Sequence, residues 1–297
     1  MDEYGRPVNS MRLSVTGECN QNCFYCHREG HDGMVRSMTL QELEVVLEAA
    51  GRVGVKRVKL TGGEPLVRPD IVDIVCISAR YMEEVSMTTN GTLLEPVAGE
   101  LRRSGLRRVN VSLDTVDREH YHAVTGTYLM DDALRGIEAA VKEGLSPVKV
   151  NIVALEDSSM EKVLDAVEAV WSMGAVPQVI EPVGAGLGKS SLMHAVEDEL
   201  SSLSSGSRER SLHRRRIYDI PWMGVVRQVE VVRPMHNTAF CANCTRIRVT
   251  GDGYIKPCLM HDQGLLDLLS PLRSGAGLED VIGLFEKAIS CREPYWK

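Results

Sequence analysis

The sequence predicts an α/β fold in which a curled parallel sheet is followed by a smaller carboxy-terminal domain. Short β-branched runs alternate with helical patterns along most of the 297 residues, and the predicted strands are regular in length. Serial strand–helix units imply parallel strands joined by crossover helices, in an open doubly wound sheet or a barrel. Because no long linker interrupts the series, we favour a partial barrel of six strand–helix units, a TIM-like (βα)6 arrangement.

Six short runs rich in β-branched residues are predicted to be the strands of this sheet. They cover residues 11–15, 55–60, 83–87, 107–113, 148–153 and 177–182. The clearest helices between them cover residues 39–54 and 159–174, and the second has one apolar face and Ser158 or Ser159 as its N-cap. In sheets of this kind the functional residues lie on loops at the carboxyl ends of the strands.

The strand–helix rhythm stops after Pro182. Residues 199–216 are rich in serine and then in arginine, which is typical of a solvated loop. Beyond this segment we predict a strand, a hairpin and a closing helix, at residues 225–232, 249–257 and 278–289. We therefore divide the chain into a partial barrel at residues 1–219 and a smaller α+β domain at residues 220–297.

The charge of the chain bears on its partners. Acidic residues outnumber basic ones by 41 to 34, and the isoelectric point is about 5.7, so we expect no nucleic-acid partner. The amino terminus lacks the basic and apolar regions of a signal peptide, and no apolar run reaches the roughly 20 residues of a membrane span. We expect a cytoplasmic protein without a membrane partner, in which the eight cysteines are metal ligands or free thiols.

Two groups of three cysteines are spaced to bind metal. They are Cys19, Cys23 and Cys26, with the spacing C-x₃-C-x₂-C, and Cys241, Cys244 and Cys258, with the spacing C-x₂-C-x₁₃-C. A turn signal at residues 251–253 is predicted to fold the last cysteine back towards the other two of its group. Each group is one ligand short of the four that a structural zinc ion takes.

Zinc is one interpretation of these groups, because His27 and His261 lie near them in the sequence and can supply a fourth ligand. The other two cysteines are poorly placed: Cys76 lies in an apolar helical stretch, where we expect a buried free thiol, and Cys291 lies in the tail. An electron-transfer ferredoxin would supply four cysteines to each cluster. A [4Fe–4S] cluster held by three thiolates leaves one iron open to a substrate or cofactor, and we favour this interpretation.

The first group, with an aromatic residue at Tyr25, resembles the cysteine motif of the radical S-adenosylmethionine (SAM) enzymes. The segment TGGEP at residues 61–65, after the second predicted strand, resembles their SAM-binding segment. Glycines at positions 62 and 63 allow the backbone to approach a cofactor closely. The resemblance implies a radical SAM barrel whose open iron binds SAM and whose reduced cluster cleaves SAM to methionine and a 5′-deoxyadenosyl radical.

The two ends of the chain resemble one family within this superfamily, the GTP 3′,8-cyclases of molybdenum cofactor biosynthesis, often called MoaA. This resemblance rests on an amino-terminal element and on an Arg-x-Arg pair after the second cysteine of the second group, at Asp2, Gly5, Arg6, Arg12, Arg246 and Arg248. It implies that a radical removes the 3′ hydrogen of GTP and that the product is (8S)-3′,8-cyclo-7,8-dihydroguanosine 5′-triphosphate. A second [4Fe–4S] cluster, held by the second group, would bind the guanine.

The resemblance also implies roles for particular residues. Those matching the family's GTP contacts are Arg12, Lys59, Thr88, Lys149, Arg246 and Arg248. Those matching its SAM contacts are Tyr25, Gly63, Ser112 and Val183. Arg246 and Arg248 are the candidate catalytic residues, because either can stabilise charge near the guanine. The implied partners are an external electron donor and the synthase that converts the product to cyclic pyranopterin monophosphate, with the chain acting as a monomer or homodimer.

Three features depart from the family pattern. Val183 stands where a methionine is common. Lys59 stands where an arginine is common, so a point charge replaces a planar fork of donors. The chain given ends in SCREPYWK, whereas many members of the family end in a Gly-Gly tail.

Two other functions fit parts of the sequence. A radical SAM maturase with an auxiliary cluster would act on a peptide, although a peptide does not require so many cations. A zinc-stabilised module would bind nucleic acid through the basic run at residues 208–216, although that run lacks interleaved aromatic residues. Residues 183–191 fail the phosphate-loop pattern, and the acidic residues of 112–122 are typical of a helix start.

Overall fold

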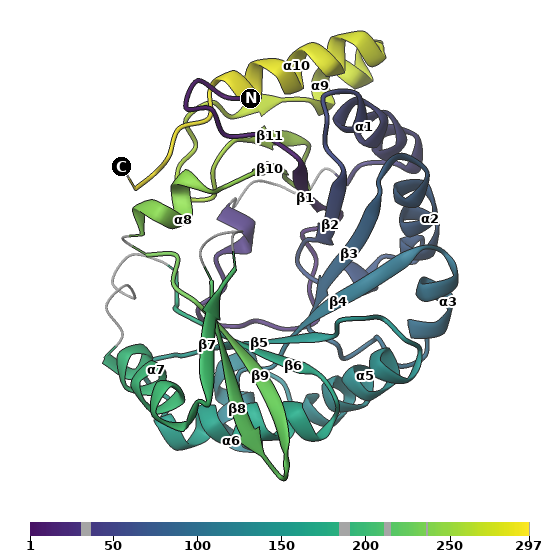
Figure 1. Cartoon of the computed structure of the whole chain (residues 1–297). Helices are drawn as coiled ribbons and strands as arrows, with labels where there is room; N and C mark the ends of the chain where they lie inside the picture. The colour runs from purple at the N-terminus through teal and green to yellow at the C-terminus, as the bar shows by residue number, and fades with distance from the viewer. Residues whose placement is uncertain (31–36, 184–190, 211–214, 236, 297) are drawn as a thin grey trace.

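A computed structural model describes residues 1–30, 37–183, 191–210, 215–235 and 237–296. Its strands form one twelve-stranded sheet in the order β12-β11-β10-β1-β2-β3-β4-β5-β6-β9-β8-β7. The sheet curves around a central region, and helices α1, α2, α3, α5 and α6 lie on its outer side (Figure 1). No helix in the described ranges is both long and apolar enough to cross a membrane.

The six predicted strands of the barrel are confirmed. They are β1 Ser10–Ser14, β2 Arg57–Thr61, β3 Glu84–Thr89, β4 Leu106–Ser112, β5 Lys149–Val153 and β6 Val176–Ile180. Each pairs in parallel with the next. The helices that connect them are α1 Leu40–Arg52, α2 Ile71–Tyr81, α3 Ala98–Arg103, α4 Arg118–Thr125, α5 Met130–Lys142 and α6 Met160–Ser172. The α/β fold class that the sequence predicts is therefore correct.

The predicted helices have clear physical causes. Thr39 and Glu42 form a capping box that begins α1 at Leu40. Ser159 caps α6 by accepting a hydrogen bond from the backbone of Lys162, as the sequence predicts. Both helices bury one apolar stripe against the sheet.

Cys76 is a prediction that the structure corrects. We expect a buried thiol from the apolar sequence around it, but Cys76 is exposed on α2. The buried side chains of this helix include Ile74, Val75 and Ile77, which pack towards the sheet. Position 76 falls on the opposite side, because residues in a helix turn by about 100° each.

The carboxy-terminal half extends both edges of the barrel sheet. Its elements are α7 Ser191–Leu203, β7 Gly206–Glu209, β8 Arg216–Trp222, β9 Val225–Val232, α8 Thr238–Ala242, β10 Arg246–Val249, β11 Tyr254–Lys256, β12 Leu266–Asp267, α9 Leu269–Arg273 and α10 Leu278–Ser290. Strand β9 pairs in parallel with β6, and β10 pairs in parallel with β1. The predicted division at residue 219 falls inside β8, and it stays a prediction.

The solvated loop predicted over residues 199–216 is wrong in two places. Helix α7 continues to Leu203, because Met193, Val196 and Leu200 are buried on one of its faces and hold the serine-rich turn in place. Strand β7 then pairs antiparallel with β8. Residues 211–214 of that segment lie outside the described residues.

The inner face of the barrel sheet is polar. Parallel strands that are buried on both faces are normally continuous hydrophobic runs. Here polar and apolar side chains alternate, and the apolar ones form the core under the helices: Met11, Leu13, Val58, Leu60, Val109, Val111, Val150, Ile152 and Val179. The polar residues between them face the centre of the barrel, which is where a functional site can be built.

Candidate functional site

The sequence-predicted cations lie together on the inner face. Arg12 on β1 stands opposite Lys59 on β2 and opposite Arg248 on β10. Because neighbouring strands lie about 4.8 Å apart, these side chains form a row of three like charges. Arg246 lies two residues before Arg248 on the same face of β10, and Lys149 lies on β5 across the barrel.

Burial and mutual repulsion make this row electrostatically costly. Burial holds the pKa of Lys59 well below its usual range, and the neighbouring Arg12 and Arg108 lower it further. The pKa of Arg246 is lowered in the same way, first by burial and then by Arg12 and Arg248. A polyanion placed against these residues would relieve the repulsion.

The sequence-predicted threonine also faces this region. Thr88 lies on β3 opposite Asn110 of β4. Its hydroxyl is buried and has no hydrogen-bond partner among the described residues. The Nζ of Lys59 donates to Asn110 Oδ1 at 2.6 Å, so the amide holds the ammonium group over the inner face. Buried hydroxyls normally find a partner, so the unpaired Thr88 fits a site that receives a polar ligand.

Two carboxylates that sequence reasoning missed balance part of the positive charge. Glu29 accepts from Arg12 at 2.6 Å and from Arg248 at 2.7 Å. Glu230 on β9 pairs with Lys149 and accepts from Gln178 Nε2 at 2.7 Å. The alternation of polar residues in the strand sequences VPQVI and VVRQVEVV was the signal that could have found the residues on β6 and β9.

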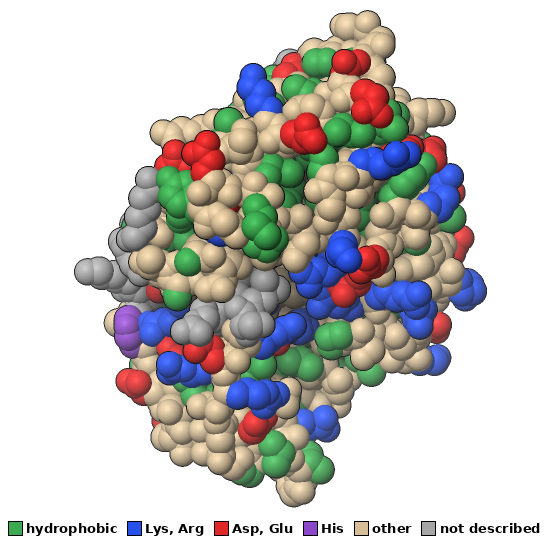
Figure 2. Space-filling model, turned by 45° about the horizontal axis from the view of Figure 1, so that its top comes forward, with side chains coloured by type: hydrophobic (Ala, Val, Ile, Leu, Met, Phe, Trp, Pro, Cys, Tyr) green, Lys and Arg blue, Asp and Glu red, His purple; other side chains and the backbone are tan. Residues whose placement is uncertain are grey.

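Basic side chains are also prominent on the surface. The face drawn in Figure 2 carries Lys and Arg side chains across its middle, with acidic side chains between them. Three further arginines approach the barrel residues: Arg210 and Arg215 pair with Glu230, at 3.1 Å and 3.6 Å, and Arg108 pairs with Glu84 at 2.5 Å. The region is therefore basic although the chain as a whole carries a net charge of −7.

The first cysteine group lies on the loop after β1, and the protein anchors this loop at several points. The backbone N–H groups of Asn22 and Phe24 donate to carbonyl oxygens of α4, at 2.9 Å and 3.2 Å. Gln21 Nε2 donates to the Tyr121 hydroxyl at 2.6 Å. Asn20 accepts from Asn90 Nδ2 at 2.7 Å, which ties the loop to the end of β3. The loop is thus held at the carboxyl ends of the strands, as expected from the fold.

The thiols of this group are suited to bind a cation. Burial raises the pKa of Cys23 to about 12, and Asp114, Cys26 and Cys19 raise it further by their negative charges. These three thiols are therefore close enough to influence one another. Bound iron would stabilise the thiolates of this group against their mutual repulsion.

The glycines of TGGEP have a structural reason of their own. A Cβ atom on Gly62 would lie 2.3 Å from the Thr16 carbonyl oxygen, and one on Gly63 would lie 2.1 Å from the Glu18 carbonyl oxygen. The segment therefore packs directly against the backbone that leads into the cysteine loop. Glu64 then accepts from Thr89 Oγ1 at 2.7 Å and from the backbone N–H of Asn90 at 2.6 Å, which joins the ends of β2 and β3.

Two of the residues matched to SAM contacts meet at the end of β4. Ser112 is the last residue of that strand, and two residues later Asp114 accepts a hydrogen bond from the Tyr25 hydroxyl at 2.5 Å. Burial raises the pKa of Asp114 to about 6. Gly63 follows β2, and Val183 follows β6 at the limit of the described residues.

The helix start that we predict within residues 112–122 is correct, since Asp117 caps α4.

The second cysteine group is assembled by the β10–β11 hairpin. These strands pair antiparallel, which turns the chain back and brings Cys258 to Cys241 and Cys244. Burial raises the pKa of Cys241, and the charges of Cys244 and Cys258 add to this effect. In the described part of the chain, no three His, Cys, Asp or Glu side chains are grouped closely enough to hold a single ion. Thiolates that bind separate iron atoms of a cube do not need that spacing.

Both ends of the chain brace this second group. Asp2 pairs with Arg6 at 2.8 Å and with Arg292 at 3.1 Å. Arg6 then donates to the carbonyl oxygen of Cys241 at 3.0 Å, and Arg292 to that of Cys244 at 2.7 Å. The amino-terminal element that resembles the family motif is thus a support for the cysteine loop.

The tail of the chain reaches the same place. The backbone N–H groups of Tyr295 and Trp296 donate hydrogen bonds to the Cys241 sulfur. The Tyr295 ring also stacks on His261 with the ring centres 6.0 Å apart. Residues 295 and 296 thus place backbone donors beside a cysteine of the second group.

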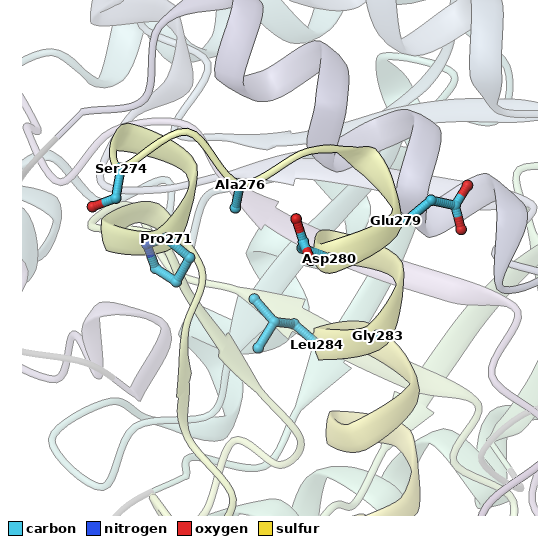
Figure 3. Close-up of a pocket in the computed structure, with 7 residues that line it drawn as sticks. All are labelled: Pro271, Ser274, Ala276, Glu279, Asp280, Gly283 and Leu284. Atoms are coloured by element: carbon cyan, nitrogen blue, oxygen red, sulfur yellow. The ribbon is translucent and has the colours of Figure 1, made fainter.

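One surface cavity lies apart from these residues. It has a volume of about 600 Å³ and lies between α9 and α10, lined by Pro271, Ser274, Ala276, Glu279, Asp280, Gly283 and Leu284 (Figure 3). Its charged side chains are acidic, and Asp280 caps the start of α10 by accepting from the backbone of Gly277 at 2.9 Å. This lining does not suit a phosphorylated ligand.

Comparisons with known proteins agree with this arrangement. Residues 13–170 match the family model of the radical SAM superfamily, and residues 181–297 match that of Molybdenum Cofactor Synthesis C. A protein of Pyrococcus abyssi named "Probable GTP 3',8-cyclase" is 44% identical over 100% of this chain and 99% of its own length. A protein of Methanocaldococcus jannaschii with the same name is 40% identical over 100% and 99%.

Solved structures share the fold. SuiB of Streptococcus suis bound to S-adenosylmethionine superposes with a TM-score of 0.65 at 16% identity, over 97% of this chain and 76% of that one. The structure titled "Native anSMEcpe with bound AdoMet" gives a TM-score of 0.62 at 15% identity, over 92% and 79%.

Proposed function

Because the chain belongs to the radical SAM superfamily and, over its full length, to the GTP 3′,8-cyclase family, we propose that it rearranges GTP to (8S)-3′,8-cyclo-7,8-dihydroguanosine 5′-triphosphate. This reaction is the first step of molybdenum cofactor biosynthesis. The observation that carries the proposal is the row of Arg248, Arg12 and Lys59 on neighbouring strands, with Arg246 beside it. A triphosphate is the part of GTP that requires such a concentration of cations.

The cysteine groups are assigned to two [4Fe–4S] clusters. Cys19, Cys23 and Cys26 would hold the cluster that binds SAM, and the anchoring of their loop and the repulsion between their thiolates support a bound cation there. The second group, which consists of Cys241, Cys244 and Cys258, would hold the cluster that binds guanine. When bound, the first cluster and SAM would supply the radical chemistry that removes the 3′ hydrogen of GTP.

The chain's own side chains then bind and orient the two small molecules. We assign SAM contacts to Tyr25, Gly63, Ser112 and Val183, and GTP contacts to Arg12, Lys59, Thr88, Lys149, Arg246 and Arg248. The GTP contacts come from β1, β2, β3, β5 and β10, so the curved sheet surrounds the ligand and limits access of water. Arg246 and Arg248, two and four residues after Cys244, are placed to stabilise charge near a guanine bound at the second group.

The proposal extends to partners and location. An external donor would reduce the clusters, and a synthase would convert the product to cyclic pyranopterin monophosphate. The cytoplasmic location, the monomeric or dimeric state and the absence of nucleic-acid and membrane partners stay predictions from the sequence.

The test of this function uses GTP that carries deuterium at the 3′ position. We expect anaerobically reconstituted protein, given SAM and a strong reductant, to transfer the deuterium to 5′-deoxyadenosine, as read by mass spectrometry. Unlabelled 5′-deoxyadenosine would keep the radical SAM assignment and reject GTP as the radical's target. The peptide-modifying alternative would then be tested with peptide substrates.

Lys149 gives the binding of GTP a defined pH dependence. Burial lowers the pKa of Lys149 to about 8, although the facing Glu230 raises it. The protonated ammonium binds phosphate, so the affinity for GTP should be constant below about pH 8 and fall by up to about tenfold per pH unit above it. Lys149→Arg keeps its proton and should remove most of this decline.

Titration calorimetry of both proteins between about pH 7 and about pH 9 checks this expectation. Equal slopes for the wild type and Lys149→Arg would mean that the charge of Lys149 does not act on GTP.

A further inference from the structure

Glu29 faces the row formed by Arg248, Arg12 and Lys59 and contacts two of its members. Its Oε1 accepts from Arg12 Nη1 at 2.6 Å, and its Oε2 accepts from Arg248 Nη1 at 2.7 Å. The Thr61 hydroxyl donates to Oε1 at 3.0 Å. Two guanidinium groups and a hydroxyl therefore converge on one carboxylate, in the way that such groups surround a phosphate.

The backbone that carries Glu29 is strained. Glu29 lies in the short helix η1 Arg28–Gly30, directly after the first cysteine group. Arg28 has a φ of 45° and Glu29 a φ of 54°, in the left-handed region where residues other than glycine are uncommon. Such a conformation persists only while surrounding contacts hold it. The ion pairs of Glu29 are contacts of this kind, so releasing the carboxylate also releases the strain.

The other carboxylate of the barrel is held differently. Glu230 lies within β9, pairs in register with Gln178 of β6 and forms its ion pair with Lys149 from a strand on the same sheet. The backbone of a strand residue cannot move away without breaking hydrogen bonds of the sheet. Glu230 therefore pairs with Lys149 from a regular strand of the sheet. Glu29 pairs with Arg12 and Arg248 from a strained segment.

We infer that Glu29 occupies, in the free protein, the position of one phosphate group of the substrate, and that a bound triphosphate displaces it. This inference rests on the proposed function, since it takes Arg12 and Arg248 as triphosphate ligands. Glu29 offsets part of the positive charge of these two side chains while the barrel holds no substrate. It also lowers the affinity for every ligand that must replace it, and a ligand with several negative charges overcomes this competition.

Removing the charge of Glu29 tests this inference. Tripolyphosphate and GTP are titrated separately into the full-length reconstituted protein by calorimetry. We expect Glu29→Gln to bind both ligands about tenfold more tightly than the wild type, because neither has to break two charge-assisted hydrogen bonds. The matched control is Glu84→Gln, which removes a carboxylate that pairs with Arg108, a residue not assigned to GTP, and leaves Arg12 and Arg248 paired with Glu29. Its gain should stay below about threefold.

Each other outcome has a definite meaning. Weaker or unchanged binding by Glu29→Gln would show that Glu29 positions the two arginines for the ligand, and the inference would be wrong. Equal gains for Glu29→Gln and Glu84→Gln would show a general effect of charge and would also overturn it. If Glu29→Gln does not fold, Glu29→Asp keeps the charge with a shorter reach and should give a smaller gain, and no gain would reject the inference. A wild type that binds neither ligand would reject the proposed function as well.

Discussion

Arg248→Ala is expected to lower kcat/KM for GTP by about a hundredfold while the affinity for SAM stays within about twofold of the wild type. Arg248 stands beside Arg12 in the cationic row and lies on β10, two residues after Arg246. Its side chain is largely buried and reaches Glu29, on the inner face. Removing it takes a donor of two hydrogen bonds from the triphosphate or the guanine, and it leaves the hydrogen bonds that anchor the first cysteine loop to α4 and to Asn90.

The measurement compares GTP turnover with SAM binding in the same reconstituted protein. Arg57→Ala is the matched control, because Arg57 is an arginine at the start of β2, two residues before Lys59, whose guanidinium already donates to Asn9 Oδ1 at 2.6 Å. Loss of SAM affinity in Arg248→Ala would show that Arg248 acts on SAM and not on GTP. Unchanged GTP kinetics in Arg248→Ala would show that Arg248 does not contact GTP.

The two cysteine groups are expected to separate radical formation from substrate binding. Cys258→Ser should lower the iron content from about eight to about four atoms per chain, since one of two cubes is lost. It should abolish GTP binding but keep cleavage of SAM. Cys23→Ser should lose the other cube and abolish SAM cleavage, and it should still bind GTP. Each of the two variants should lose GTP turnover completely, because each cluster does a different part of the chemistry.

Iron and sulfide analysis, with SAM cleavage and GTP binding on the same samples, checks this separation. The exposed Cys76 is the control, and Cys76→Ser should behave as the wild type. Zinc without sulfide in the wild type would establish the zinc interpretation of the cysteine groups. Full iron content and GTP binding in Cys258→Ser would reject the second cluster.

Elements with strong local patterns were predictable. The strands β1 to β6 are short β-branched runs, and the helices α1 and α6 carry caps and apolar stripes within their own sequence. The second cysteine group was predictable for the same reason, since the turn at 251–253 lies within the hairpin it forms.

Features that depend on distant contacts were not predictable in this way. Residues 199–203 read as a loop, but packing of Val196 and Leu200 continues the helix through them. The pairing of Glu29 with Arg248 joins residues that are 219 positions apart. No local pattern encodes such a pair, because it depends on where the loop after β1 crosses the inner face.

The sequence by itself determined the kind of chemistry: the cysteine spacings, the Arg-x-Arg pair and the alternation of strands and helices are all contained in short segments. Only the tertiary structure decided which charges meet. It set Arg12 between Lys59 and Arg248 through the register of three parallel strands, and it brought both chain ends to the second cysteine group. The physical reason is that ligand spacing is a local property of the chain, whereas the balance of buried charge depends on side chains that only folding brings within a few ångströms of one another.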